Sequence, residues 1–119
     1  MNSYIGTYTG KHFYPLDPKA EDICIEDIAH SLSNLCRFNG HTKRFYSVAQ
    51  HSLNVERFIK KLSWGERLRL YGLMHDFAEA YIGDMTTPYK VTFGHLVTDT
   101  EKEIMNKVYE RFIIFFSVS

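Results

Sequence analysis

The spacing of apolar side chains is the feature that most constrains how this chain folds. From Ile25 onward, apolar residues recur three and four positions apart, first at Ile28, Leu32 and Leu35. This is the period of an α-helix that turns one face towards a core. The pattern predicts a first helix over residues 26–36. Because the same spacing returns in later segments, it also predicts an all-α fold built as a compact helical bundle.

Start and stop signals place three further helices. Ser47 is a candidate N-cap for a helix that runs to about residue 62. Ser63 and Glu66 have the spacing of a capping box, which predicts a third helix that ends near residue 82. Pro88 disfavours helix at the residue before it, so residues 84–88 are expected to form a loop, and a last helix is expected from about residue 99. The inward-facing residues of the second helix are expected to be Val48, Leu53, Val55, Phe58 and Ile59.

The first 20 residues have a different pattern. Tyr4 and Ile5, and then residues 12–14, flank Gly6 and Gly10, and the segment PLDP follows as a rigid break. This predicts a short N-terminal extended arm or hairpin ahead of the helices.

Size, charge and cysteine content narrow the class of protein. The 119 residues suit one domain over residues 1–119. Fourteen basic and fourteen acidic side chains cancel, so there is no electrostatic reason to expect a nucleic acid or a membrane as partner. Cys24 and Cys36 are too few for a disulfide scaffold and lack CxxC spacing. The chain shows no signal peptide and no apolar run of about 20 residues, so a cytoplasmic protein is expected.

The C-terminal sequence FIIFFSVS is apolar on every side of a helix. A helix of that kind must be buried. The sequence therefore predicts either a homo-oligomer that forms through this apolar C-terminal helix or a domain that is C-terminally shortened.

A histidine, an aspartate and a glutamate interrupt the apolar run of the third predicted helix. His75 and Glu79 are four positions apart and would share a face, with Asp76 at its edge. Imidazole nitrogen and carboxylate oxygen together suit a divalent ion such as Zn, Mn, Co or Fe. If the second and third helices pack side by side, His51 can face the same point. Spacing alone leaves an alternative open, in which the histidines are boundary residues and Glu79 is simply solvated.

Two longer stretches carry a resemblance to a known family. They are IEDIAHSLSNLCRFNGHTKRFYSVAQHS and, after it, LMHDFAEAYIGDMTTPYK. Together they resemble the HD-domain metal-dependent phosphohydrolases, and most closely the bacterial and phage branch of 5′-deoxynucleotidases and deoxynucleoside triphosphate hydrolases. The likeness covers roughly residues 6–112, and three ordered motifs are far more specific than a lone His-Asp pair.

The resemblance implies a role for each matching position. His51, His75 and Asp76 match the ligands of one divalent metal ion, whether Mn, Co, Zn, Fe or Mg. Glu79 and Asp84 match catalytic carboxylates, and Arg37 matches an arginine that contacts phosphate or sugar.

Four further residues are weaker candidates for substrate binding. His41 either lines the nucleotide pocket or caps the loop after the first helix, and Lys43 either meets a phosphate or is solvated. Thr87 and Lys90 flank Pro88, near the expected substrate. The aromatic residues Phe38, Phe45 and Tyr46 are expected in the core rather than as platforms for a base.

The family pattern usually includes a fourth ligand, an aspartate on a later helix, and Asp99 is the last aspartate in this chain. The resemblance thus implies a hydrolase in which metal-activated water attacks the phosphorus of a deoxynucleotide. The alternative is a catalytically impaired HD scaffold that binds a nucleotide or a protein partner without turnover.

Overall fold

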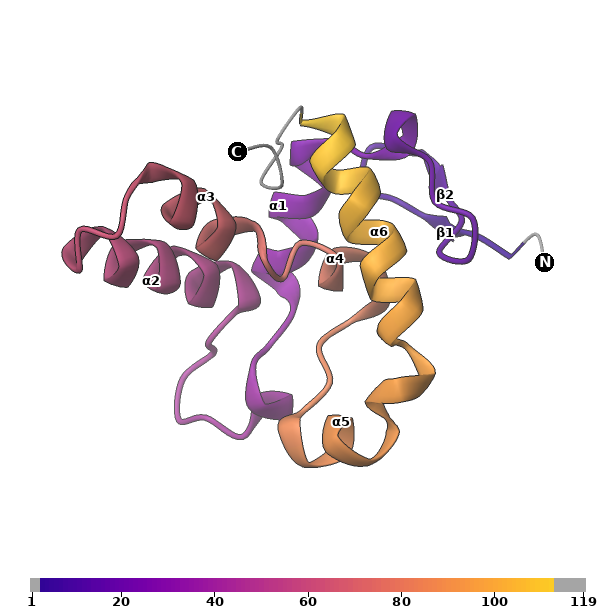
Figure 1. The fold of residues 1–119 in the computed structure, drawn as a ribbon. Coiled ribbons are helices and arrows are strands. Elements are labelled where there is room, and N and C mark those ends of the chain that lie inside the picture. Colours follow the sequence, from indigo (N-terminus) through magenta and orange to yellow (C-terminus); the bar gives the residue numbers. More distant parts are fainter. Residues whose placement is uncertain (1–2, 113–119) are drawn as a thin grey trace.

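The computed structural model describes residues 3–112 of the chain (Figure 1). Most of these residues are helical, and one small antiparallel sheet lies near the N-terminus. The predicted fold class is therefore confirmed in its main terms, as a helical protein with an N-terminal hairpin. In chain order the elements are β1 (Ile5–Gly6), β2 (His12–Phe13), α1 (Ile25–Asn34), α2 (Val48–Lys61), α3 (Glu66–Met74), α4 (Glu79–Ile82), α5 (Thr87–Phe93) and α6 (Thr98–Arg111), with short 3₁₀ turns at Ala20–Asp22, Phe38–Gly40 and Gly94–Leu96.

The N-terminal hairpin is tied to α1 by one buried carboxylate. Ile5 pairs with Phe13 and Gly6 with His12 across the two strands. In the connecting turn, the backbone N–H and the hydroxyl of Thr9 donate hydrogen bonds of 2.8 and 3.0 Å to the carboxylate of Asp27. The arm is thus held against the helices.

The buried core lies where α1, α4 and α6 meet the hairpin. The ring of Phe13 stacks on that of Tyr81, with 3.8 Å between the ring centroids. Ile28 and Leu32 of α1 and Ile104 and Val108 of α6 are almost fully buried. The helical spacing of these four residues is the reason that they reach one interior.

Helices α2 and α3 pack against each other and project to one side of the body (Figure 1). Val48 at the start of α2 is fully buried, but Leu53 and Phe58 are 41% and 59% exposed. The prediction that they face the core is wrong. The reason is that the far end of α2 packs against α3 and extends beyond the reach of the central core.

Two serines were predicted to begin helices, and only one of these predictions is confirmed. Ser47 caps α2 as predicted, because its hydroxyl accepts a 3.0 Å hydrogen bond from the Gln50 N–H. The predicted capping box at Ser63 is wrong. Ser63 has a positive φ of 57°, Gly65 occupies the N-cap position with φ 102°, and α3 starts at Glu66 without a side-chain cap.

Two further differences concern the segment after α3. The predicted single helix to residue 82 is interrupted after Met74, and α4 begins only at Glu79. Residues 87–93 form helix α5, although a loop was predicted as far as Pro88. Pro88 stands in the first turn of α5, where its missing N–H costs no intrahelical hydrogen bond.

One prediction falls mainly outside what the structure describes, and two others concern described residues. The apolar segment over which oligomerisation was predicted lies mainly in residues 113–119, beyond the described part of the chain, so that call stays a prediction. Both cysteines are unpaired and half-buried. Among the described residues, no helix combines the length and the apolar character that crossing a membrane requires.

The packing of α1 yields a stability prediction. Ile28→Ala should lower the free energy of unfolding by about 2 to 4 kcal/mol, because it leaves a cavity in the core. Ile25→Ala is the matched control on the same helix, since Ile25 is 49% exposed, and it should cost less than about 1 kcal/mol. Urea denaturation monitored by circular dichroism measures both. Equal losses for the two variants would show that the core is wrongly placed.

Candidate active site

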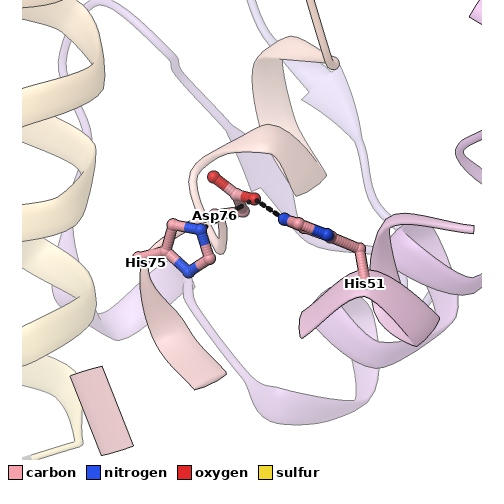
Figure 2. A group of neighbouring side chains, drawn as sticks. All are labelled: His51, His75 and Asp76. Atoms are coloured by element: carbon pink, nitrogen blue, oxygen red, sulfur yellow. Dashed lines mark ion pairs between the residues drawn. The ribbon is translucent and has the colours of Figure 1, made fainter. Parts of the chain in front are cut away.

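Side chains from two separate parts of the sequence meet at one point (Figure 2). His51 reaches in from the first turns of α2, while His75 ends α3 and Asp76 follows it. Asp76 Oδ2 is 3.6 Å from His51 Nε2 and 3.2 Å from His75 Nε2. One donor atom from each residue lies within 4.8 Å of the other two. The three side chains therefore form a compact cluster, called the His-His-Asp cluster below.

A glycine at the contact of α2 and α3 allows this meeting. A Cβ atom on Gly72 would lie 2.5 Å from Ile59 Cδ1 and 3.0 Å from Val55 Cγ1. Without a side chain at position 72, α2 and α3 pack closely and the Ile59 and Val55 side chains keep their positions. His51, one turn before Val55, is thereby held opposite the end of α3.

Each imidazole turns its Nε2 towards the Asp76 carboxylate. The Nδ1–H of His75 donates a 2.6 Å hydrogen bond to the Gly72 carbonyl, which fixes the orientation of that ring. Burial, with Arg37 nearby, lowers the pKa of His51, so that ring is neutral at pH 7. Two ring nitrogens and a carboxylate oxygen thus converge, and this donor set suits a divalent cation.

The spacing of the cluster fits one metal ion. Ligand bonds of about 2.1 Å to a shared ion place neighbouring donor atoms roughly 3 to 3.5 Å apart. The distance of 3.2 Å from Asp76 to His75 falls in this range, and the 3.6 Å to His51 lies just above it. The hydrogen bond from His75 to Gly72 is also the kind of outer contact that orients a histidine ligand. The residues present therefore fit a divalent cation.

Glu79 lies beside the cluster, though not in the way that a continuous helix predicts. Between α3 and α4 the backbone N–H groups of Phe77, Glu79 and Tyr81 bond to carbonyls three residues back. In such a 3₁₀ turn, residues i and i+3 lie above one another. Glu79 is thus brought over Asp76 rather than over His75.

The environment of Glu79 strongly favours its protonated form. The side chain is 7% exposed, and its Oε1 has no hydrogen-bond partner among the described residues. Burial, followed by the charges of Asp76 and Asp84, raises the pKa of Glu79 to about 9. The nearby Arg37 offsets this only in part. Without a cation in the cluster, Glu79 is a buried neutral acid.

Arg37 and Asp84 form a partly buried ion pair next to the cluster. The Nη1 of Arg37 donates a 3.0 Å hydrogen bond to Asp84 Oδ2, and the two side chains are 22% and 10% exposed. Backbone bonds from Arg37 to Tyr46 and from Val48 to Leu35 close the base of the loop that carries the arginine. The buried Nε of Arg37 has no partner among the described residues. The guanidinium therefore keeps one buried donor without an acceptor.

The rest of this loop lies outside the cluster. His41 and Lys43 are exposed at its tip, and neither lines the cavity beside the His-His-Asp cluster. Phe38 and Phe45 are 55% and 66% exposed, so the prediction that they are core residues is wrong. Phe38 instead lies under the Arg37 guanidinium, 5.2 Å from its central carbon. This end of the loop faces solvent because the bridge between Cys36 and Ser47 holds only its base.

Helix α5 places the two remaining candidates differently. Thr87 is an exposed residue at its start. Lys90 forms a 3.3 Å ion pair with Glu101 of α6 and lines a cavity of about 600 Å³ together with His75, Asp76 and Glu79. Only Lys90 is thus brought to the cluster.

The sequence analysis did not identify the α6 residues of this cavity. They are Thr98, Glu101, Lys102, Met105, Asn106 and Tyr109. Their spacing of three and four was present in the sequence, but the neighbouring apolar stripe of α6 gave the stronger signal. Only the packing of α6 against the α3–α4 segment shows that a second, polar face of α6 lines the cavity.

Comparison with known proteins agrees with this geometry. Residues 48–113 match the profile of the HD domain family, which covers more than half of the chain. The chain belongs to the HD domain family. Members of this family generally bind divalent metal ions and act as phosphohydrolases, which supports an enzyme at that coarse level.

Two relatives extend the likeness beyond the family profile. The uncharacterized protein YfdR of Escherichia coli (strain K12) is 46% identical over 88 residues, which cover 74% of this chain and 47% of YfdR. An uncharacterized protein of Rhodobacter capsulatus is 42% identical over 108 residues, which cover 87% of this chain and 55% of that protein. The chain thus spans about half the length of the curated relatives that it matches.

The burial of Glu79 yields a pH-dependent stability prediction. At pH 8 the unfolded chain carries an ionised Glu79, and folding without metal must protonate it. Glu79→Gln should therefore stabilise the metal-free protein at pH 8 by roughly 1 to 3 kcal/mol, and by almost nothing at pH 4, where both states are protonated. Thermal unfolding in EDTA at the two pH values measures this. Glu103→Gln, at an exposed position of α6, is the control and should change neither value. A destabilised Glu79→Gln variant at pH 8 would contradict the assignment.

Metal binding tests the cluster itself. His51→Ala should weaken binding of Zn²⁺ or Co²⁺ by more than the roughly 10- to 100-fold typical of losing an outer-shell partner. The wild-type affinity should fall below about pH 6, because ligand imidazoles must be unprotonated. Competition with a chromophoric chelator gives both values. His95→Ala, an exposed histidine after α5, should bind as wild type does. Equal affinities for the two variants would exclude His51 as a ligand.

Proposed function

We propose that this protein is a metal-dependent phosphohydrolase that acts on deoxynucleotides. The observation that carries the proposal is the meeting of three groups in an HD-domain chain: the His-His-Asp cluster, the Arg37–Asp84 pair and buried Glu79. Together they supply a cation site, a phosphate contact and a proton-carrying group around one point. The deoxynucleotide substrate is supported by the sequence motifs that the chain shares with deoxynucleotidases and deoxynucleoside triphosphate hydrolases.

Arg37 is the candidate for holding the phosphate. Asp84 binds one nitrogen of the guanidinium and fixes its plane, while the buried Nε still lacks an acceptor. A phosphate oxygen at Nε would satisfy that donor, and an arginine fork orients phosphate in a way that a lysine cannot.

Glu79 is the candidate for proton transfer. It is buried next to Asp76 and lines the same cavity as His75, so it lies within the region where a phosphate would react. A buried carboxyl beside the reacting phosphate can take a proton from water or deliver one to a departing oxygen. A divalent cation in the cluster would supply activation of water and polarisation of the phosphoryl group.

The assay is a panel of deoxynucleoside mono- and triphosphates with Mn²⁺, Co²⁺, Zn²⁺ or Mg²⁺, followed by detection of phosphate, pyrophosphate and triphosphate. Turnover is expected with at least one pair. Arg37→Ala should lower kcat/KM by about 100-fold or more, because it removes a phosphate-binding cation. Arg44→Ala, an exposed arginine in the same loop, is the matched control and should retain activity. No turnover by folded, metal-loaded protein would reject the proposal and favour a scaffold that binds nucleotide without hydrolysis.

A further inference from the structure

The loop between α1 and α2 lies in a part of the chain without acidic residues. No aspartate or glutamate occurs from residue 28 to residue 55, although the whole chain contains fourteen of them. The same stretch contains Arg37, Lys43 and Arg44. The expectation of no nucleic-acid partner rests on the net charge of zero, but salt screens exposed charges beyond about 10 Å. A partner at this loop would therefore meet a local positive charge.

Two of the three cations are available to a partner. Arg37 is paired with Asp84 at the base of the loop. Lys43 and Arg44 are exposed, and neither forms an ion pair with another residue between positions 3 and 112. Figure 1 shows the loop extending away from α1 and α2. Residues 38–45, called the loop tip below, thus present two adjacent positive charges to solvent.

Two aromatic rings accompany these cations. Phe38 and Phe45 are 55% and 66% exposed, although burial of either ring would stabilise the fold. The ring of Phe38 lies against the Arg37 guanidinium, with 5.2 Å from the guanidinium carbon to the ring centroid. Phe45 directly follows Lys43 and Arg44 in the chain. Exposed rings beside cations are the combination that single-stranded nucleic acids use, because bases stack on the rings while phosphates meet the cations.

Backbone hydrogen bonds hold the loop in a defined shape. The N–H of Arg37 donates a 2.8 Å hydrogen bond to the Tyr46 carbonyl and closes the base of the loop. Within it, the N–H groups of Gly40 and His41 donate 3.0 Å bonds to the carbonyls of Arg37 and Phe38. Phe38 has a φ of 55°, which a non-glycine residue keeps only where its surroundings require it. A preformed loop of this kind loses little conformational freedom when it binds a ligand.

The composition of the loop tip favours a single strand over a membrane or a duplex. Its only apolar side chains are Phe38 and Phe45, whereas segments that lie on a membrane bury a continuous apolar face. Asn39 and His41 add polar groups that can bond to base edges or phosphates. In a duplex the bases stack on one another, so the two rings would have no base to bind.

We propose that the loop tip binds single-stranded nucleic acid, with a base stacked on Phe45 and with phosphates of the strand at Lys43 and Arg44. None of these three residues lines the cavity beside the His-His-Asp cluster, so the loop tip is a separate surface. The inference does not depend on hydrolysis. Because few phosphates are contacted, binding should depend on salt with a slope of only about −0.7 per contact.

Fluorescence anisotropy of labelled oligonucleotides tests the proposal on the 119-residue protein in EDTA. Strands of about 12 nucleotides lie within the usual site sizes of single-strand binding proteins. Wild type should bind oligothymidylate or oligouridylate, and the tighter of the two identifies the strand as DNA or RNA. That strand should bind at least about tenfold more tightly than the corresponding duplex. Equal binding of strand and duplex would overturn the proposal. So would binding to vesicles of equal parts phosphatidylcholine and phosphatidylserine without binding to either strand.

A substitution at position 45 tests the stacking contact. Phe45→Ala should weaken binding of the strand by about 5- to 100-fold, which is the usual effect of losing one stacked base. Phe58→Ala is the matched control, because Phe58 is 59% exposed on α2 and should leave the affinity unchanged. Thermal unfolding checks that both variants are folded. Equal affinities for the two variants would remove Phe45 from the surface and overturn the proposal.

The salt dependence tests the two cations. The double variant Lys43→Gln and Arg44→Gln should reduce the slope of log K against log salt by roughly 1.4, since two phosphate contacts are lost. The double variant Lys60→Gln and Lys61→Gln removes two exposed lysines at the end of α2 and should leave the slope unchanged. Equal slopes for the two double variants would contradict phosphate binding at the loop tip.

Competition with dTMP separates the loop tip from the cavity. An equal concentration of dTMP should leave the oligonucleotide bound, because a mononucleotide cannot combine the stacking and phosphate contacts of a strand. Displacement by dTMP would place the strand in the cavity and reject the loop tip as its site. Failure of deoxynucleotide hydrolysis would reject the proposed function and would not change any of these binding results.

Discussion

The close contact between α2 and α3 is the constraint on which the site depends. Gly72 lets the two helices approach to a distance that a Cβ would obstruct, and this places His51 opposite His75 and Asp76. The same residue offers its carbonyl to His75 Nδ1 and so orients the imidazole. One glycine thus controls both the position of one histidine and the direction of the other.

The site concentrates charge that opposes folding in the absence of a ligand. Asp76, Glu79 and Asp84 lie close together in a partly buried region, and the raised pKa of Glu79 shows the cost of ionising all three. Arg37 offsets part of that cost from one side. A cation in the His-His-Asp cluster would offset it from the other. The arrangement is typical of a site in which stability is reduced to keep reactive groups in place.

A cavity of about 600 Å³ lies between the α3–α4 segment and α6. The segment from His75 to Ala78 follows a 3₁₀ path, which aligns Asp76 with Glu79 on one wall of this cavity. Helix α6 contributes its apolar stripe to the core through Ile104 and Val108, and its neighbouring polar face to the cavity. A single helix therefore supports the core and provides one wall of the cavity.

The sequence by itself determined the helical class, the N-terminal hairpin, the N-cap at Ser47 and the residue types needed for a metal site, because apolar period and capping chemistry are local properties. The sequence did not predict the interruption after Met74, helix α5 or the exposed side of α2. Each of these features depends on which other helix packs against the segment. Only the tertiary structure shows that His51 lies beside Asp76, that Arg37 pairs with Asp84 and that a cavity lies along α6. These contacts join residues far apart in the chain, and their geometry is fixed by packing rather than by spacing.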